Sequence, residues 1–201
     1  MKKIGILGGT FNPIHYGHLL LGETAYQDFG LDKVLVMPNK NPGYKDIDKD
    51  ISDWDRLNMV KLAIADNPHF ELSTIEYERE GITYTADTLL ELKAYHPDEE
   101  YYFIMGADSL FHMESWHKPE EILQLATILV AGRDGASRNE IDSQIDYLSN
   151  RFEACNIEYL DAPAYDISSY MIRKSVKNHK NIRYMVSDSV REYIYENNLY
   201  L

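Results

Sequence analysis

The chain contains a single cysteine, Cys155, among its 201 residues. One cysteine excludes an intrachain disulfide and a metal site built from several thiolates. We therefore expect Cys155 to be an inert thiol that is buried or half-buried.

Long hydrophobic runs are also missing. The first apolar run, at residues 4–7, is bounded by charged Lys2 and Lys3 and is broken by Gly5 and the Gly8-Gly9 pair. It is shorter than the core of a secretory signal peptide, and no other segment approaches the roughly 20 apolar residues that span a bilayer. We expect a cytoplasmic protein with no membrane partner.

Basic residues are in short supply, with 20 Lys and Arg against 33 Asp and Glu, so the net charge is −13. Binding to a nucleic-acid backbone needs clustered basic side chains, and this balance argues against it. An anionic ligand would have to be held by local features. The composition, 44% hydrophobic and 26% charged, is that of a folded globular protein. No repeat or linker divides the chain, so we expect one domain over residues 1–201.

Apolar strand-like runs alternate with segments of helical periodicity. This order predicts an α/β fold, a Rossmann-like doubly wound parallel sheet with helices on both faces and a C-terminal helical segment. The polar segment 133–150 receives no expected element. Strands are expected at 4–7, 34–37, 70–73, 75–77, 101–105, 127–131 and 157–160. Helices are expected at 15–29, 88–95, 122–126, 169–176 and 187–195, and a further helix is expected after its cap at Ser52-Asp53, with Leu57, Val60, Leu62 and Ala63 at helical spacing.

The most informative stretch follows the first strand and reads Gly8-Gly9-Thr10-Phe11-Asn12-Pro13-Ile14-His15-Tyr16-Gly17-His18. Its glycines fit neither the dinucleotide-binding pattern G-x-G-x-x-G nor a P-loop. His15 and His18 are three residues apart, so both imidazoles fall on one face of the helix that begins there. Free N–H groups and the helix dipole make that end an anion site suited to a polyphosphate.

Two other interpretations of the histidine pair are weaker. The pair could be an ordinary surface feature, or half of a zinc site, but a third ligand of suitable spacing is lacking. The preceding strand and Gly-Gly-Thr turn favour the anion site.

This stretch resembles the signature of the HxGH nucleotidyltransferases. A second signature of that superfamily, Ile-Ser-Ser-x-x-x-Arg, is present at residues 167–173. A serine cap with an arginine one turn later could clamp phosphates, although a capped helix with a surface arginine is commoner by itself. The resemblance implies an ATP site formed by Gly8, Gly9, Thr10, Phe11, His15, His18, Ile167, Ser168, Ser169 and Arg173.

Within that superfamily the chain most resembles the bacterial nicotinate-nucleotide adenylyltransferases, over essentially its whole length. The matching segments are residues 37–39, 78–89 and 104–108, together with Trp116. The Glu76–Glu80 charge cluster is expected to be a solvated face. The resemblance places Gly106 and Asp108 at the adenosine ribose, and Asn39, Lys45, Tyr84, Thr85, Trp116 and His117 at the mononucleotide. The sequence departs from the family pattern at Asn12, Tyr44, His117 and Tyr170.

The reaction that the resemblance implies is AMP transfer from ATP to nicotinate mononucleotide, giving deamido-NAD and pyrophosphate. Catalysis would rest on Thr10, His15, His18 and Arg173, with Mg²⁺ bound through the ATP phosphates and no metal ligands from the protein. A homodimer is compatible with the sequence. The alternatives are another acceptor (nicotinamide mononucleotide, phosphopantetheine or a cytidylyl reaction), a nucleotide-binding module without turnover, and a structural or interaction protein.

Overall fold

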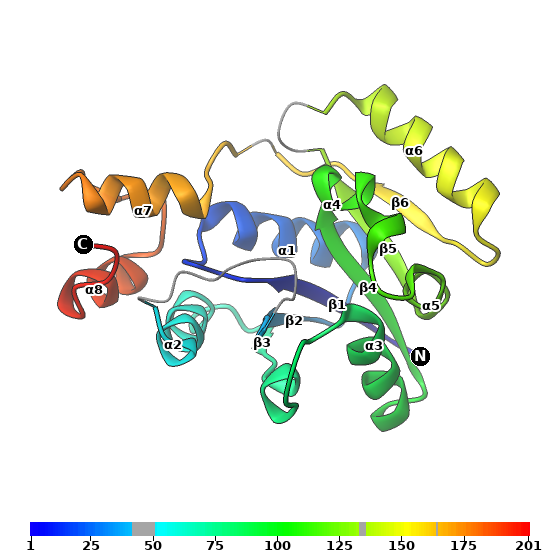
Figure 1. Ribbon diagram of the computed structural model, residues 1–201, viewed down its shortest axis with the longest axis horizontal. Coiled ribbons are helices and arrows are strands. Elements are labelled where there is room, and N and C mark those ends of the chain that lie inside the picture. The colour runs from blue at the N-terminus through cyan, green and yellow to red at the C-terminus, as the bar shows by residue number, and fades with distance from the viewer. Residues whose placement is uncertain (42–50, 133–135, 164) are drawn as a thin grey trace.

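The computed structural model describes residues 1–41, 51–132, 136–163 and 165–201. Its centre is a six-stranded sheet in the order β3-β2-β1-β4-β5-β6, and every neighbouring pair is parallel (Figure 1). This is the strand order 3-2-1-4-5-6 of the Rossmann architecture. The strands are β1 (Lys2–Gly9), β2 (Lys33–Pro38), β3 (Phe70–Leu72), β4 (Glu99–Gly106), β5 (Ala126–Ala131) and β6 (Ile157–Leu160).

Helices connect the strands and close the chain. Two of them are short 3₁₀ turns, η1 (Ile75–Glu78) and η2 (Met113–Ser115). The α-helices are α1 (Tyr16–Phe29), α2 (Asp53–Ala63), α3 (Thr85–Tyr95), α4 (Ala107–Phe111), α5 (Pro119–Leu125), α6 (Arg138–Arg151), α7 (Ser169–Lys177) and α8 (Asp188–Glu196).

Each face of the sheet has its own hydrophobic core. Side chains alternate along a strand, so Val34 and Val36 of β2 point to one face and Leu35 and Met37 to the other. The first face packs against α1, α2, α7 and α8, and the second against α3, α4, α5 and α6. The predicted doubly wound fold with covered faces and a C-terminal helical segment is therefore confirmed.

Strands β1 and β4 are neighbours, and the strand order reverses between them. Helix α1 leads from β1 toward one edge of the sheet, and the segment after β4 leads toward the other. In open α/β sheets this switch point leaves a crevice beyond the carboxyl ends of the strands. Here those ends are Gly9 and Gly106, two of the residues predicted to contact the nucleotide.

Two expectations for individual elements are wrong. Residues 75–77 belong to the 3₁₀ helix η1 and do not form a strand. The hydrogen-bond ladder between β2 and β3 ends where the N–H of Ser73 donates to the carbonyl of Val36. After that point the N–H of Tyr77 donates to the carbonyl of Thr74, which closes the 3₁₀ turn. The polar segment without an expected element contains α6, which begins at a capping box of Ser137 and Glu140.

Other boundaries differ by a few residues. Helix α3 begins at Thr85, three residues before its expected start, and Gly30 ends α1 in the left-handed conformation. Cys155 is partly exposed, and burial raises the pKa of its thiol. No helix in the described ranges has both the length and the apolar content to cross a membrane.

Candidate active site

The histidine pair lies at the start of α1. His15 is the N-cap, and its carbonyl accepts from the N–H groups of His18 and Leu19. The His15 main-chain N–H donates to Nδ1 of His18 at 3.3 Å. The two imidazoles stack with centroids 3.7 Å apart at 27°, and the edge of Phe11 meets the His18 ring at 5.0 Å. The expected common face of the two imidazoles is confirmed.

Gly17, between the two histidines, is required by this packing. A Cβ atom at Gly17 would lie 3.1 Å from the ring of His15. That separation is tighter than an ordinary carbon contact, and the His15 ring, only 1% exposed, has little room to move. The spacing His-x-Gly-His is therefore a packing requirement of the stacked pair.

The second motif contacts the first across the fold. Ser168 is the N-cap of α7 and accepts from the N–H of Met171, while the Ser169 hydroxyl donates to the carbonyl of Pro13 at 2.8 Å. The Nη1 of Arg173 donates to the carbonyl of Asn12 at 2.7 Å. The two motifs, predicted from opposite ends of the chain, thus meet at the loop between β1 and α1.

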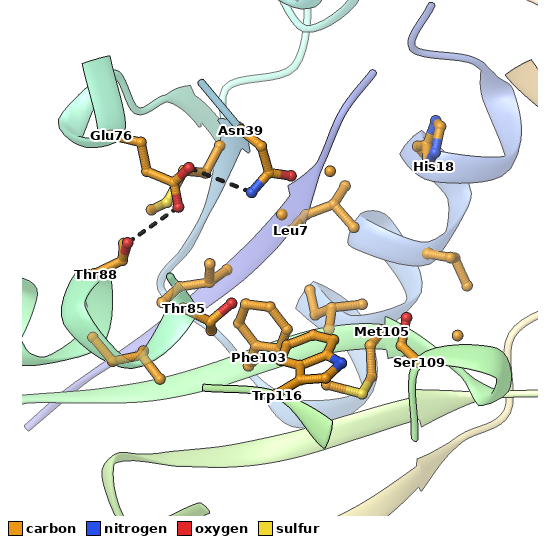
Figure 2. Close-up of a pocket in the computed structure, with 18 of the residues that line it drawn as sticks. Leu7, His18, Asn39, Glu76, Thr85, Thr88, Phe103, Met105, Ser109 and Trp116 are labelled. Carbon is orange, nitrogen blue, oxygen red and sulfur yellow. Dashed lines mark hydrogen bonds between the residues drawn. The ribbon is translucent and has the colours of Figure 1, made fainter. Parts of the chain in front are cut away.

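A cavity of about 180 Å³ opens at the switch point. Its floor is formed by β1 and β4, and its walls come from β2, η1, α1, α3 and the segment after β4 (Figure 2). Trp116 lies edge-on to Phe103, with centroids 6.1 Å apart. The predicted site residues that line this cavity are Gly8, Gly9, His18, Asn39, Thr85, Gly106, Asp108 and Trp116.

The other predicted residues lie around the cavity or outside the description. Tyr84 and His117 stack on each other at 4.2 Å, each next to a lining residue. His15 is buried beneath His18, and Lys45 lies outside the described residues. Thr10, Phe11, Ile167, Ser168, Ser169 and Arg173 belong to the two motifs beside the cavity and do not line it.

Sequence reasoning missed Arg56, which is completely buried in α2. Its Nη1 donates to the carbonyls of Thr10 at 2.9 Å and Asn39 at 2.7 Å, and its Nη2 pairs with Asp53 at 2.5 Å. One guanidinium therefore links the loop after β1 to the end of β2. The local sequence does not predict the burial of Arg56 or its two main-chain contacts, because an exposed arginine could occupy the same position of the helix.

Sequence reasoning also missed Glu76, and the expected solvated face is wrong at this position. Glu78 and Glu80 are exposed, but Glu76 is 3% exposed and lines the cavity. The 3₁₀ turn η1 is the cause, since it directs Ile75 and Glu76 inward together. Burial of Glu76 could have been predicted from the sequence only by predicting this turn.

Tyr77, the next residue in η1, has its pKa raised to about 12, chiefly by burial of its hydroxyl, an effect that nearby Arg56 partly offsets. It stays neutral in the physiological range and supplies no base. Within the residues that the structure describes, no group of three His, Cys, Asp or Glu side chains could hold a metal ion.

Comparisons with known proteins agree with a nucleotide-binding crevice of this construction. The class is given by the cytidylyltransferase-like family, whose sequence model matches residues 6–175. Among solved structures, the nicotinic acid mononucleotide adenylyltransferase of Plasmodium falciparum complexed with NaAD superimposes with a TM-score of 0.81, covering 100% of this chain and 98% of that chain at 22% identity. At that identity the similarity defines the fold.

Closer relatives define the family. The probable nicotinate-nucleotide adenylyltransferase of Lachnoclostridium phytofermentans is 47% identical over 201 residues, covering 100% of both chains. That of Dehalococcoides mccartyi strain CBDB1 is 44% identical over 200 residues, covering 98% of this chain and 97% of the relative. The chain therefore belongs to the nicotinate-nucleotide adenylyltransferase family.

Proposed function

We propose that this protein transfers AMP from ATP to nicotinate mononucleotide, with deamido-NAD and pyrophosphate as products. The observation that carries the proposal is the convergence of two distant motifs on one loop, beside a cavity at the switch point. The indole of Trp116 lines that cavity, and its flat face could stack on a pyridine ring. The family membership supports the same reaction.

The ATP phosphates would lie at the start of α1, against His18 and the main chain of Gly8 and Gly9. His15, stacked beneath His18, would fix its orientation as well as add to the field at the phosphates. A guanidinium has five N–H donors, so the bond from Arg173 to Asn12 leaves others for the leaving pyrophosphate. Thr10 would add a hydroxyl donor, with Ser168, Ser169 and Ile167 presenting the start of α7.

The mononucleotide would occupy the other side of the cavity. Its ring would stack on Trp116, and its carboxylate would accept from the main-chain N–H groups of Thr85 and His117, with Tyr84 packed on His117. Asn39 would contact the bound mononucleotide from the end of β2, and Lys45 would serve its phosphate.

The chemistry is then an in-line displacement. An oxygen of the mononucleotide phosphate attacks the α-phosphorus of ATP, the bond from that phosphorus to the bridging oxygen breaks, and its electron pair leaves with pyrophosphate. The attacking oxygen is already anionic, so no general base is needed. Alignment and charge stabilisation supply the rate enhancement.

Magnesium would enter with ATP as part of the substrate. It would neutralise phosphate charge there, while the protein side chains orient the nucleotide and not the metal. Asp108, at the start of α4, would accept hydrogen bonds from the ribose hydroxyls of ATP, near Gly106. A homodimer and a cytoplasmic location complete the proposal.

A pyrophosphate-release assay tests the proposed function. With MgATP, nicotinate mononucleotide should give the highest kcat/KM, above nicotinamide mononucleotide and phosphopantetheine, and CTP should replace ATP poorly. Preference for another acceptor would change the assigned substrate. Nucleotide binding without pyrophosphate release would instead identify a binding module.

A further inference from the structure

Glu76 places a buried negative charge in the wall of the cavity. Its Oε1 accepts from the hydroxyl of Thr88 at 3.1 Å, and its Oε2 accepts from Nδ2 of Asn39 at 3.3 Å. Figure 2 shows both bonds and the carboxylate held between the end of β2 and α3. Two neutral donors therefore fix the position of the carboxylate without neutralising it.

Basic groups near Glu76 are engaged elsewhere. Across the described ranges, no lysine or arginine lies within ion-pair distance, 4.0 Å, of Glu76. Arg79 donates to the Thr88 hydroxyl and pairs with Glu91 at 3.5 Å. Lys40 donates to two main-chain carbonyls, those of Tyr77 and Arg79. Both cations are thus held by other partners, and neither forms an ion pair with Glu76.

A buried carboxylate of this kind is costly unless a cation approaches it. The other side of the same cavity is formed by the aromatic rings of Phe103 and Trp116. Figure 2 shows these rings on the wall opposite the carboxylate of Glu76. A negative wall facing an aromatic wall is complementary to a flat aromatic cation.

We propose that Glu76 is a specificity-determining residue that recognises the positive charge of the pyridinium ring, so that the site selects the pyridinium form of the mononucleotide over an uncharged ring. This inference rests on the proposed function. ATP has no such cation, since its adenine is neutral and its phosphates are anionic. Glu76 should therefore affect the mononucleotide and leave ATP unaffected.

The test compares nicotinate mononucleotide with its 1,4-dihydro form, which keeps the carboxylate, ribose and phosphate but has no ring charge. Affinities for the protein are measured by calorimetry, and kcat/KM by pyrophosphate release. We expect the wild-type protein to prefer the charged ring by at least about tenfold, and Glu76→Gln to reduce that preference to less than about threefold. The KM for ATP should stay within about twofold in the variant.

Glu78→Gln is the matched control, because it removes the same charge from an exposed position of the same turn. It should keep the wild-type preference. Equal binding of the two rings by the wild-type protein would overturn the inference, and that measurement does not depend on any variant folding. So would a Glu76→Gln variant that weakens both rings equally, which would assign Glu76 to hydrogen bonding alone. Pyrophosphate release by the wild-type protein tests the proposed function separately.

Discussion

The two halves of the cavity are built in different ways. The part proposed to hold the ATP phosphates is formed by one continuous stretch, from Gly8 to His18, held by two side chains of α7 that bond to its main chain. The mononucleotide half is assembled from short contributions of β2, η1, α3 and the end of η2. Phosphate binding can be supplied by main-chain N–H groups and one helix start, whereas recognition of a particular ring needs side chains from several directions.

The halves also differ in charge. The start of α1 and Arg173 present positive charge where the phosphates would lie. The opposite half contains the buried carboxylate of Glu76, which has no ion-pair partner among the described residues. This difference would direct the triphosphate and the pyridinium ring to opposite sides before any reaction. Arg56 is the group that contacts the main chain of both halves.

The largest effect on activity should come from a substitution that disturbs both halves of the cavity. Arg56→Met leaves the half-buried carbonyls of Thr10 and Asn39 without this donor, at a cost of about 2–4 kcal/mol in the free energy of unfolding. We expect kcat/KM for both substrates to fall by about a hundredfold or more, since small misplacements of substrate are expensive. Urea unfolding and initial rates with each substrate varied would measure the two effects.

Arg191→Met is the control for that variant. Arg191 is an arginine of α8 with a mostly buried side chain that pairs with Asp188 and has no bond to either substrate loop among the described contacts. It should cost stability without changing either KM. If Arg56→Met raised the KM of only one substrate, Arg56 would support only one half of the cavity. The inference that it connects the two halves would then be wrong.

A smaller effect should follow from breaking the ATP half alone. His18→Ala removes the cavity-lining imidazole, and we expect turnover to fall at least tenfold, which corresponds to about 1.4 kcal/mol of activation free energy. His96→Ala is the control, because His96 is exposed just before β4, at the opposite end of that strand from the cavity. Wild-type turnover in His18→Ala would remove the role assigned to this residue.

The smallest effect should come from the mononucleotide half. Trp116→Ala removes the indole wall, and a stacking contribution of about 0.5–1.5 kcal/mol predicts a KM for the mononucleotide raised by roughly 2–12-fold. The KM for ATP should not change. Trp54→Ala is the control, since the other tryptophan of the chain is 69% exposed on α2. An equal rise in both KM values would show that the halves are not independent.

Sequence patterns were a good guide wherever the determining interactions are local. The stacked histidine pair at the start of α1 follows from a helix start and two histidines three residues apart. A serine cap of α7 was equally accessible, and the structure assigns it to Ser168. Hydrophobic alternation predicted the sheet, because strands buried on both faces leave a strong apolar signal.

The failures are the residues whose role depends on distant packing. Ile75-Glu76-Tyr77 has the alternation of a strand, and only the end of the β2–β3 ladder turns it into η1. Burial of Glu76 follows from that turn, and burial of Arg56 follows from the approach of α2 to two separate loops.

The amino-acid sequence by itself determined the fold class and the family, because caps, turns and strand runs are decided by near neighbours. Only the tertiary structure decided which charges became buried and what they face. The type of an amino acid does not specify whether its side chain is exposed to water or lines a cavity, because segments far away in the chain decide which it is.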